Sequence, residues 1–205
     1  TVIGSTGPAG VGSSETNVVW LHTASGVSTS GSSVTAWADQ SGNANDFTTV
    51  GANTINYATN QVNGEAALQF AGDDRGLILN NFDSMPNIAM TYFAVVNTSA
   101  TGNEAIVSYA TAANNNEHLV FPSSTNTNVY VAGTSRNFSN TFKDGNWNII
   151  SSTWSSNDGV ANFYRNSTSS SSVTYTVGDT IERGGSLVLG EEQDNVGGGF
   201  DAAQN

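Results

Sequence analysis

The chain has 205 residues, and its 5 Lys and Arg face 17 Asp and Glu, which gives a formal net charge of -12. So few cations exclude nucleic-acid binding, because each neutralised phosphate needs a Lys or Arg. They also disfavour binding to an anionic membrane surface. The absence of cysteine excludes disulfides and thiolate metal sites, and no apolar run reaches the ~18 residues that a transmembrane helix needs.

Charged residues make up only 11% of the chain, whereas Ser, Thr and Asn are abundant beside 22 Gly. These residue types favour strands and turns over helices. Their dominance over charged residues is typical of extracellular proteins and predicts a secreted protein with one main domain. Residues 1–14 are rich in Gly and Ser without hydrophobic periodicity, so we expect a linker or extended arm there and a β-sandwich over residues 15–205.

Short runs with β-branched or aromatic content recur along the chain between Gly, Asn, Asp and Ser clusters. The predicted strands cover residues 17–21, 66–70, 76–79, 89–97, 105–109, 118–121, 128–132, 147–154, 160–165 and 186–189. Such spacing, without a convincing helical period, predicts an all-β fold: an antiparallel jelly-roll sandwich of two sheets. Residues 92–96 and 147–154 are apolar on nearly both faces, which predicts two central strands.

The segment from Trp37 to Asp46 is rich in Asp and Asn side chains. Side chains of this kind bond to nearby backbone groups and hold turns. We therefore expect a strand that ends at a buried Trp and is followed by a loop braced by these side chains, with no chemistry of its own.

An acidic segment lies near the end of the chain, where a predicted strand over residues 187–189 runs into Glu191, Glu192, Asp194 and Asp201, with glycines between them. Four carboxylates so close together repel one another unless a cation is present. Ca²⁺ takes six to eight oxygen ligands from carboxylates, amides and backbone carbonyls. Suitable ligand types come from Glu192, Gln193, Asp194, Asp201 and Gln204.

The alternative interpretation of this segment is a solvated acidic loop without a metal. The segment is not an EF-hand, because the spaced Asp and Asn series with a closing Glu is absent. It also lies in a Gly-rich stretch rather than on a strand with alternating carboxylates, which is the arrangement found in concanavalin-like glycosidases. We therefore expect no catalytic residues, although a polysaccharide-degrading enzyme stays the third hypothesis.

The second half of the chain, from residue 89 to residue 205, resembles the pentraxin family, a branch of the laminin-G and concanavalin A-like jelly rolls. The resemblance is carried by the acidic segment, by the turn that holds Asn115 and Asn116, and by the WNIISSTW run over residues 147–154. The first half resembles laminin-G-like modules on bacterial surface proteins of the Bacteroidota type, through Trp20-Leu21 and the stretch from Trp37 to Asn43.

The resemblance implies two adjacent calcium ions. The side chains of Asn115 and Asn116, with Glu192, Asp194 and the backbone carbonyl of Gln193, would hold the first ion. The second would be held by Glu192, Asp194, Asp201 and Gln204. In the family, the ligand then completes the coordination sphere with its own oxygens.

Two departures from the family bear on this expectation. Asn115 stands where the family offers Asp, so one charged ligand is lost and the first calcium site should be weaker. The core disulfide of the family is also missing, since Ser151 occupies one of the cysteine positions. The resemblance further implies one more strand after Gln204, so we expect a sandwich that lacks its closing C-terminal strand, completed by neighbouring residues or by another chain.

These observations lead to a calcium-dependent carbohydrate-binding or adhesion module of a secreted bacterial cell-surface protein, whose partner is a glycan or another extracellular ligand. The residues that contact this ligand directly are not identified by the sequence. The second hypothesis is a structural or assembly module of a surface filament, in which calcium only stabilises the fold.

Overall fold

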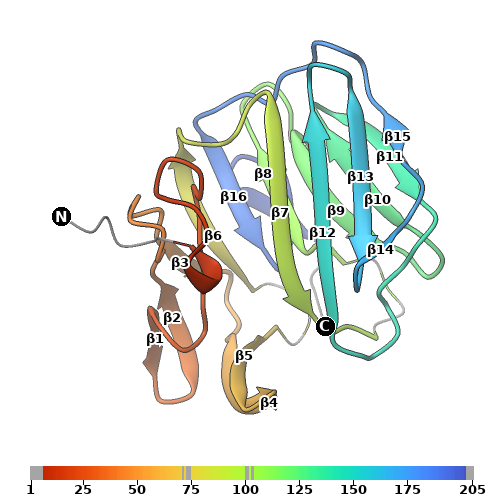
Figure 1. Ribbon diagram of the computed structural model, residues 1–205. Helices are drawn as coiled ribbons and strands as arrows, with labels where there is room; N and C mark the ends of the chain where they lie inside the picture. The colour runs from red at the N-terminus through yellow and green to blue at the C-terminus, as the bar shows by residue number, and fades with distance from the viewer. Residues whose placement is uncertain (1–6, 71, 73–74, 100–101, 103, 202–205) are drawn as a thin grey trace.

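A computed structural model describes residues 7–70, 72, 75–99, 102 and 104–201. The fold is all-β, as predicted: a single 3-10 turn, η1 (Pro8–Gly10), is followed by strands (Figure 1). The strands are β1 (Val27–Ser30), β2 (Ser33–Trp37), β3 (Phe47–Val50), β4 (Asn56–Val62), β5 (Glu65–Gln69), β6 (Gly76–Phe82), β7 (Ala89–Val96), β8 (Val107–Ala110), β9 (His118–Pro122), β10 (Thr127–Val131), β11 (Thr134–Phe138), β12 (Asn148–Ser155), β13 (Val160–Arg165), β14 (Thr168–Ser169), β15 (Val173–Thr174), β16 (Gly185–Leu189), β17 (Glu192–Asn195) and β18 (Gly198–Asp201).

Two antiparallel sheets face each other as a jelly-roll sandwich. The large sheet runs in the order β11-β10-β9-β8-β16-β6-β3-β2-β4-β5, with β1 beside β2. The small sheet runs β14-β13-β12-β7, with β15 beside β13, and β17 and β18 form a separate hairpin. Figure 1 shows the small sheet in front of β6, β16 and β8–β11 of the large one.

The core lies between the two sheets. Along β12 the side chains alternate, so that Ile150 and Trp154 are buried while Ile149 is exposed. The opposite sheet contributes Tyr109 and Leu187, which lie side by side on β8 and β16. This period-two alternation is what a strand buried on one face requires.

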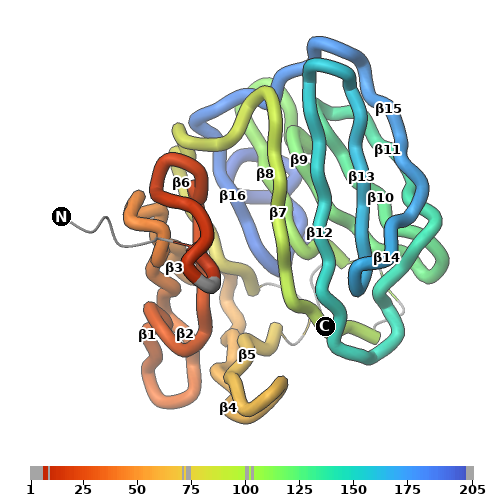
Figure 2. Tube along the Cα trace, in the orientation of Figure 1, coloured from red at the N-terminus to blue at the C-terminus, as the bar shows by residue number. Residues whose placement is uncertain are grey.

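Strands β1–β5, between residues 27 and 69, extend the large sheet beyond β6 (Figure 2). The strand predicted over residues 17–21 is wrong, because these residues are irregular. Their backbone groups bond to side chains of the loop after β2 instead: the Trp20 N–H donates to Asp39 Oδ1 over 2.8 Å, and Asn45 Nδ2 donates to the Val18 carbonyl over 2.6 Å. The predicted loop braced by Asp and Asn side chains is confirmed, and Asp39 also accepts the N–H groups of Ser41 and Asn45.

The N-terminal arm expected over residues 1–14 is described only from residue 7. Two carbonyls in it contact the sandwich through side-chain amides, because Asn17 Nδ2 donates to Val11 O over 2.8 Å and Asn43 Nδ2 donates to Ser14 O over 2.9 Å. The division of the chain at residue 14 stays a prediction.

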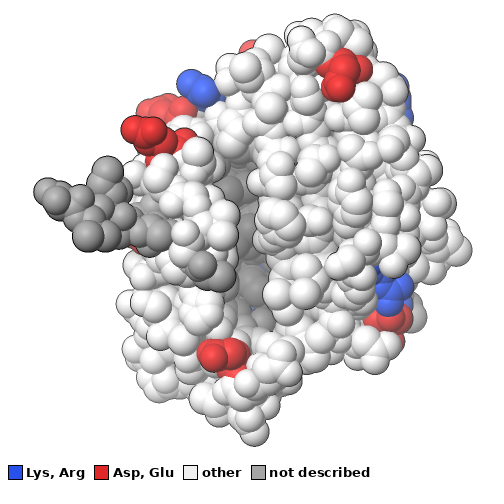
Figure 3. Space-filling model, in the orientation of Figure 1, with Lys and Arg blue, Asp and Glu red and all other residues white. Residues whose placement is uncertain are grey.

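β7 differs from its predicted place. The sequence predicts a central strand, whereas β7 forms the edge of the small sheet and, among the described residues, pairs only with β12. Phe93 and Val95 are 74% and 57% exposed on its outer face. Figure 3 shows the surface hollowed beside β7, between this strand and the segment that carries β1–β3.

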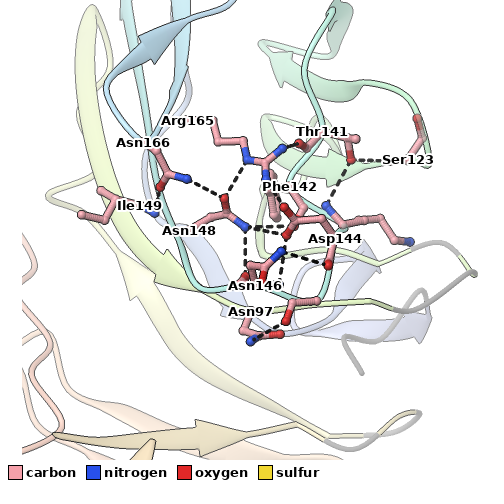
Figure 4. A network of polar contacts seen from close by, with 12 residues as sticks. Asn97, Ser123, Thr141, Phe142, Asp144, Asn146, Asn148, Ile149, Arg165 and Asn166 are labelled. Atoms are coloured by element: carbon pink, nitrogen blue, oxygen red, sulfur yellow. Dashed lines mark hydrogen bonds and ion pairs between the residues drawn. The ribbon is translucent and has the colours of Figure 1, made fainter. Parts of the chain in front are cut away.

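A polar network joins the start of β12 to the end of β13 (Figure 4). Asn148 Oδ1 accepts hydrogen bonds from Arg165 Nε and Asn166 Nδ2, over 2.6 and 2.9 Å. Arg165 also pairs with Asp144. The Asp144 pKa is lowered to about 2, chiefly because the carboxylate accepts the backbone N–H of Asn146. This network stabilises the end of the small sheet where β12 begins and β13 ends.

No helix in the described part of the chain combines the length and the hydrophobicity needed to cross a membrane.

Candidate functional site

The acidic segment forms a β-hairpin within its Gly-rich stretch. β17 and β18 pair with Glu192 opposite Asp201 and Asn195 opposite Gly198, which leaves a two-residue turn at Val196 and Gly197. Gly197 has a φ of +68°, a backbone conformation that glycine adopts without strain. Gly197 therefore allows a tight two-residue turn in this acidic, Gly-rich stretch.

Gln193 anchors this hairpin to the outer face of the large sheet. Its side chain is fully buried, and Nε2 donates to the backbone carbonyls of Ser108 and Ser186, both over 2.9 Å. Oε1 accepts from the Ser186 hydroxyl and from the Gly197 N–H. Every polar atom of this side chain thus has a partner, so only its backbone carbonyl remains a proposed calcium ligand.

Glu192 and Asp194 flank Gln193 along β17 and therefore lie on the opposite face of that strand. Burial raises the pKa of Glu192 well above its ordinary value, and a hydrogen bond to Asp201 and the charges of Asp201 and Asp194 add to the rise. Three carboxylates held in this way repel one another, and a cation would relieve the repulsion.

A turn between β8 and β9 supplies the amides of the site. It is closed by reciprocal backbone hydrogen bonds between Thr111 and Asn114, and Asn114 Oδ1 accepts the Asn116 N–H over 3.0 Å. These bonds hold Asn115 next to the hairpin, where its Nδ2 donates to Asp194 Oδ1 over 3.3 Å. The structure therefore brings together two segments that are 79 residues apart in the sequence.

A hollow of about 490 Å³ opens between this turn and the hairpin, lined by residues 111–115 on one side and 194–196 on the other. The described glycines help to shape it: a Cβ on Gly199 would lie 2.9 Å from the Asp194 Cβ, and Gly199 has a φ of +64°. A side chain at residue 199 would therefore displace Asp194.

The sequence-predicted ligands fall into two contacting pairs. Asn115 contacts Asp194, and Glu192 contacts Asp201. Asn116 Nδ2 lies 3.4 Å from Asn115 Oδ1, which joins it to the first pair. Gln204 lies outside the described residues.

Glu191, the first acid of the segment, is buried at the start of β6. It is 1% exposed, and its Oε1 accepts the Arg75 N–H over 2.7 Å. This carboxylate therefore connects the start of β17 to the start of β6.

In the described residues, no three Asp, Glu, His or Cys side chains are grouped closely enough to hold a metal ion by themselves. A calcium ion here would need amide and backbone oxygens in addition to carboxylates, which is the mixed oxygen set that calcium prefers. Asn116 Oδ1 supports this fit, because it is buried and has no hydrogen-bond partner. An orphaned buried oxygen on the turn that contacts the hairpin is suited to accept a hard cation.

Two residues that hold the hairpin carry no signal in the sequence. Ser108 and Ser186 resemble any other serine, and only the pairing of β8 with β16 places both beneath Gln193. His118 is the first residue of β9. It is 2% exposed, its Nδ1 lies 2.9 Å from the Tyr130 carbonyl, and burial lowers its pKa to about 4.

Comparison with known families matches the part of the chain from β6 onward. The model of the pentaxin family matches residues 76–205, so the match begins at β6 and covers the site. C-reactive protein 1.1 of Limulus polyphemus is 31% identical over 137 residues, which are 64% of this chain and 56% of that protein. Human neuronal pentraxin-1 is 45% identical over 62 residues, which are 30% of this chain and 14% of that protein.

Solved structures support the same fold. The heptameric SAP-like pentraxin of Limulus polyphemus superposes with a TM-score of 0.56 at 20% identity, over 77% of this chain and 70% of that chain. A GH54 α-L-arabinofuranosidase superposes with a TM-score of 0.54 at 17% identity, over 84% of this chain and 45% of that enzyme. At these identities the likeness concerns the sandwich alone.

The fold is a lectin-like jelly-roll sandwich. The chain belongs to the pentaxin family. It spans about half of the length of the C-reactive protein that it matches and a small part of neuronal pentraxin-1.

Proposed function

We propose that the chain is a calcium-dependent carbohydrate-binding or adhesion module of a secreted bacterial cell-surface protein. Pentraxins are extracellular, calcium-dependent binding proteins rather than enzymes, and we assign no catalytic residue. Calcium bound between the hairpin and the turn would stabilise both segments and offer its remaining coordination positions to oxygens of a ligand.

The observation that carries this proposal is the contact between Asn115 and Asp194 beside the pair formed by Glu192 and Asp201. It supports a shared oxygen site between two loops, for which the proposed ligands are Asn115, Asn116, Glu192, Gln193, Asp194, Asp201 and Gln204. The raised pKa of Glu192 supports it as well, because uncompensated carboxylates gain most from a divalent cation.

Calcium should therefore raise the melting temperature. A ligand that binds only the folded state at a concentration of about 100 times its Kd adds about 2.7 kcal/mol to the free energy of unfolding. Calorimetric titration with calcium should give a saturable isotherm, and Asp194→Asn together with Glu192→Gln should abolish it. Glu65→Gln on the exposed β4–β5 hairpin removes one carboxylate elsewhere and should leave calcium binding unchanged.

The absence of both heat and a melting shift with the unmodified chain would contradict the proposal. So would binding by the double variant that equals binding by the Glu65→Gln control.

A second candidate function is assembly, in which calcium only stabilises the sandwich. The edge of β7 favours it: the strand has eight residues and no charged side chain, and nothing in the described part of the chain pairs with its free edge. Natural proteins usually protect such an edge with charges, Pro or a covering segment. We propose that a further strand closes the small sheet by lying in the surface groove beside β7 that Figure 3 shows. This strand would come from neighbouring residues of the same protein or from another chain.

The two functions respond differently to chelation. An assembly module should self-associate in size-exclusion chromatography whether or not calcium is removed, and should bind no glycan. A binding module should stay monodisperse and lose glycan binding when calcium is removed.

A further inference from the structure

We infer that Glu191 is a positioning residue of the proposed calcium site: it holds the start of β17 against residues that precede β6, so that this part of the chain sets the calcium affinity of the hairpin. The inference rests on the proposed function, because it concerns the affinity of the same site. The residues that hold Glu191 lie outside the family match, which begins at residue 76. The N-terminal part of the chain would thus take part in calcium binding without supplying a ligand.

The β17–β18 hairpin depends on outside contacts for its position. Its two strands have four residues each and, in the described part of the chain, form a sheet of their own. A two-stranded hairpin is marginally stable at best in water. Gln193 anchors the middle of β17, because its side chain bonds to Ser108 and Ser186. A second anchor holds the start of β17, where the proposed ligand Glu192 lies.

Glu191 is the polar part of this second anchor. It lies directly before β17 and is 1% exposed, and its Oε1 accepts the N–H of Arg75, the residue directly before β6, over 2.7 Å. A carboxyl oxygen is a good acceptor for a backbone N–H. An apolar side chain at residue 191 would leave this N–H without its partner, which is costly where water does not replace it.

Gly190, the residue before Glu191, is the apolar part of the same anchor. Its φ is +87°, and its N–H donates to the Ile106 carbonyl over 3.2 Å. A Cβ on Gly190 would lie 2.4 Å from the Phe70 ring, so this ring packs directly against the Gly190 backbone. Phe70 follows β5. The two residues before β17 are therefore both in contact with residues that precede β6.

Arg75 carries the connection further into the N-terminal part of the large sheet. Its Nη1 donates to the Thr54 carbonyl over 2.7 Å, and Thr54 lies between β3 and β4. The contacts therefore run from the β3–β4 connection through Arg75 to Glu191, which is bonded covalently to the proposed ligand Glu192. A change at either end of this series can reach the other through two hydrogen bonds.

The anchor bears on affinity because calcium binds only a hairpin that presents its carboxylates in the right place. The apparent Kd rises as the fraction of molecules in that arrangement falls. If the start of β17 detaches from Arg75, fewer hairpins are competent at any moment. Coupling between two sites is reciprocal, so calcium should in turn hold the Glu191 contact closed by the same factor.

The test compares Glu191→Leu with Glu191→Gln by calorimetric titration with calcium chloride. Glu191→Gln keeps an acceptor oxygen without the charge, so its Kd should stay within about threefold of the unmodified chain. Glu191→Leu loses the acceptor and should bind calcium about tenfold more weakly, as the loss of one partly buried hydrogen bond to a carboxyl group allows. In the unmodified chain, saturating calcium should slow hydrogen exchange of the Arg75 N–H by about tenfold as well.

A control variant separates positioning from general stability. Arg165→Met removes contacts with Asn148 and Asp144 in the polar network at the end of the small sheet. It should lower the midpoint of urea unfolding and leave the calcium Kd within about twofold. If Glu191→Leu fails to fold, Arg75→Met serves instead: it removes only the bond to the Thr54 carbonyl and should weaken calcium binding by about threefold.

Three results would overturn the inference and leave calcium binding intact. They are an unchanged Kd in Glu191→Leu (or in Arg75→Met where that variant replaces it), equal weakening by Glu191→Gln and Glu191→Leu, which would indicate a charge effect, and exchange of the Arg75 N–H that ignores bound calcium. A lack of calcium binding by the unmodified chain would instead contradict the proposed function. The two failures are therefore distinguishable.

Discussion

Replacing Gln193 tests whether the acidic hairpin depends on one buried amide. The side chain has no solvent exposure and takes part in four hydrogen bonds, to Ser108, to Ser186 twice and to Gly197. Gln193→Leu removes all four while keeping a similar volume. A buried hydrogen bond contributes about 1 kcal/mol, so about 4 kcal/mol is lost, and the added apolar burial returns about 1–2 kcal/mol. We expect a net destabilisation of about 2–3 kcal/mol.

Urea unfolding measures this change, and amide hydrogen exchange at Gly197 reports on the hairpin directly, because its N–H donates to Gln193 Oε1. Gln193→Glu keeps the shape but turns an oxygen toward two carbonyl groups, so its cost should be at least as large. Gln61→Leu, on the exposed face of β4, is the matched control and should stay within about 0.5 kcal/mol.

A Gln193→Leu variant with unchanged stability and unchanged exchange at Gly197 would refute the reasoning. The hairpin would then be held by its own turn and not by the large sheet. Calcium affinity should fall together with hairpin protection, because Glu192 and Asp194 are presented by the same strand.

Three further perturbations test other parts of the fold. Asp144→Asn should lower the free energy of unfolding by only about 1 kcal/mol near pH 7, because the Asp144 side chain is a third exposed. The folded-state pKa of Asp144, about 2, lies below the ordinary 3.8. The difference from the unmodified chain in urea unfolding should therefore persist above pH 4 and vanish as the pH falls toward 2. Glu104→Leu leaves the 97% buried Lys143 side chain without its carboxylate partner and should cost about 3–5 kcal/mol by urea unfolding, part of which Lys143→Met in the same chain should restore. Gly190→Ala should lower the melting temperature measured by circular dichroism, because residue 190 has a φ of +87° and a Cβ there would lie 2.4 Å from the Phe70 ring.

The limits of sequence prediction are clearest where side chains replace backbone pairing. Residues 17–21 have the composition of a strand, yet Asp39 and Asn45 bind their backbone groups from a loop that lies 19 and 27 residues away. Composition alone cannot distinguish a neighbouring strand from a set of side-chain amides as the partner of a backbone group.

In the acidic segment, the sequence indicates only a Gly-rich stretch after a predicted strand. In the structure, Gly197 makes a tight turn and Gln193 fixes the register of a hairpin. The carboxylate pairing of Glu192 with Asp201 follows from that register, which the sequence does not reveal. The contact of Asn115 with Asp194 was expected only through resemblance to the family, because nothing in the local sequence links segments so far apart.

β7 was predicted well in extent but not in position. Its run of apolar residues indicates burial on both faces, which is typical of a central strand, and the structure nevertheless leaves Phe93 and Val95 exposed at an edge. The mismatch between an apolar sequence and an exposed surface is the physical reason for proposing that a further strand covers this edge.

The most direct test of the account is a crystal structure of the chain grown with saturating calcium, with anomalous differences measured at a long wavelength. The account predicts one or two anomalous peaks between the turn and the hairpin, each within about 2.3–2.6 Å of oxygens of Asn116, Glu192 and Asp194. The same map would test whether Gln204 joins the coordination sphere. An ordered hairpin without an anomalous peak under these conditions would contradict the calcium site and, with it, the proposed mode of ligand binding.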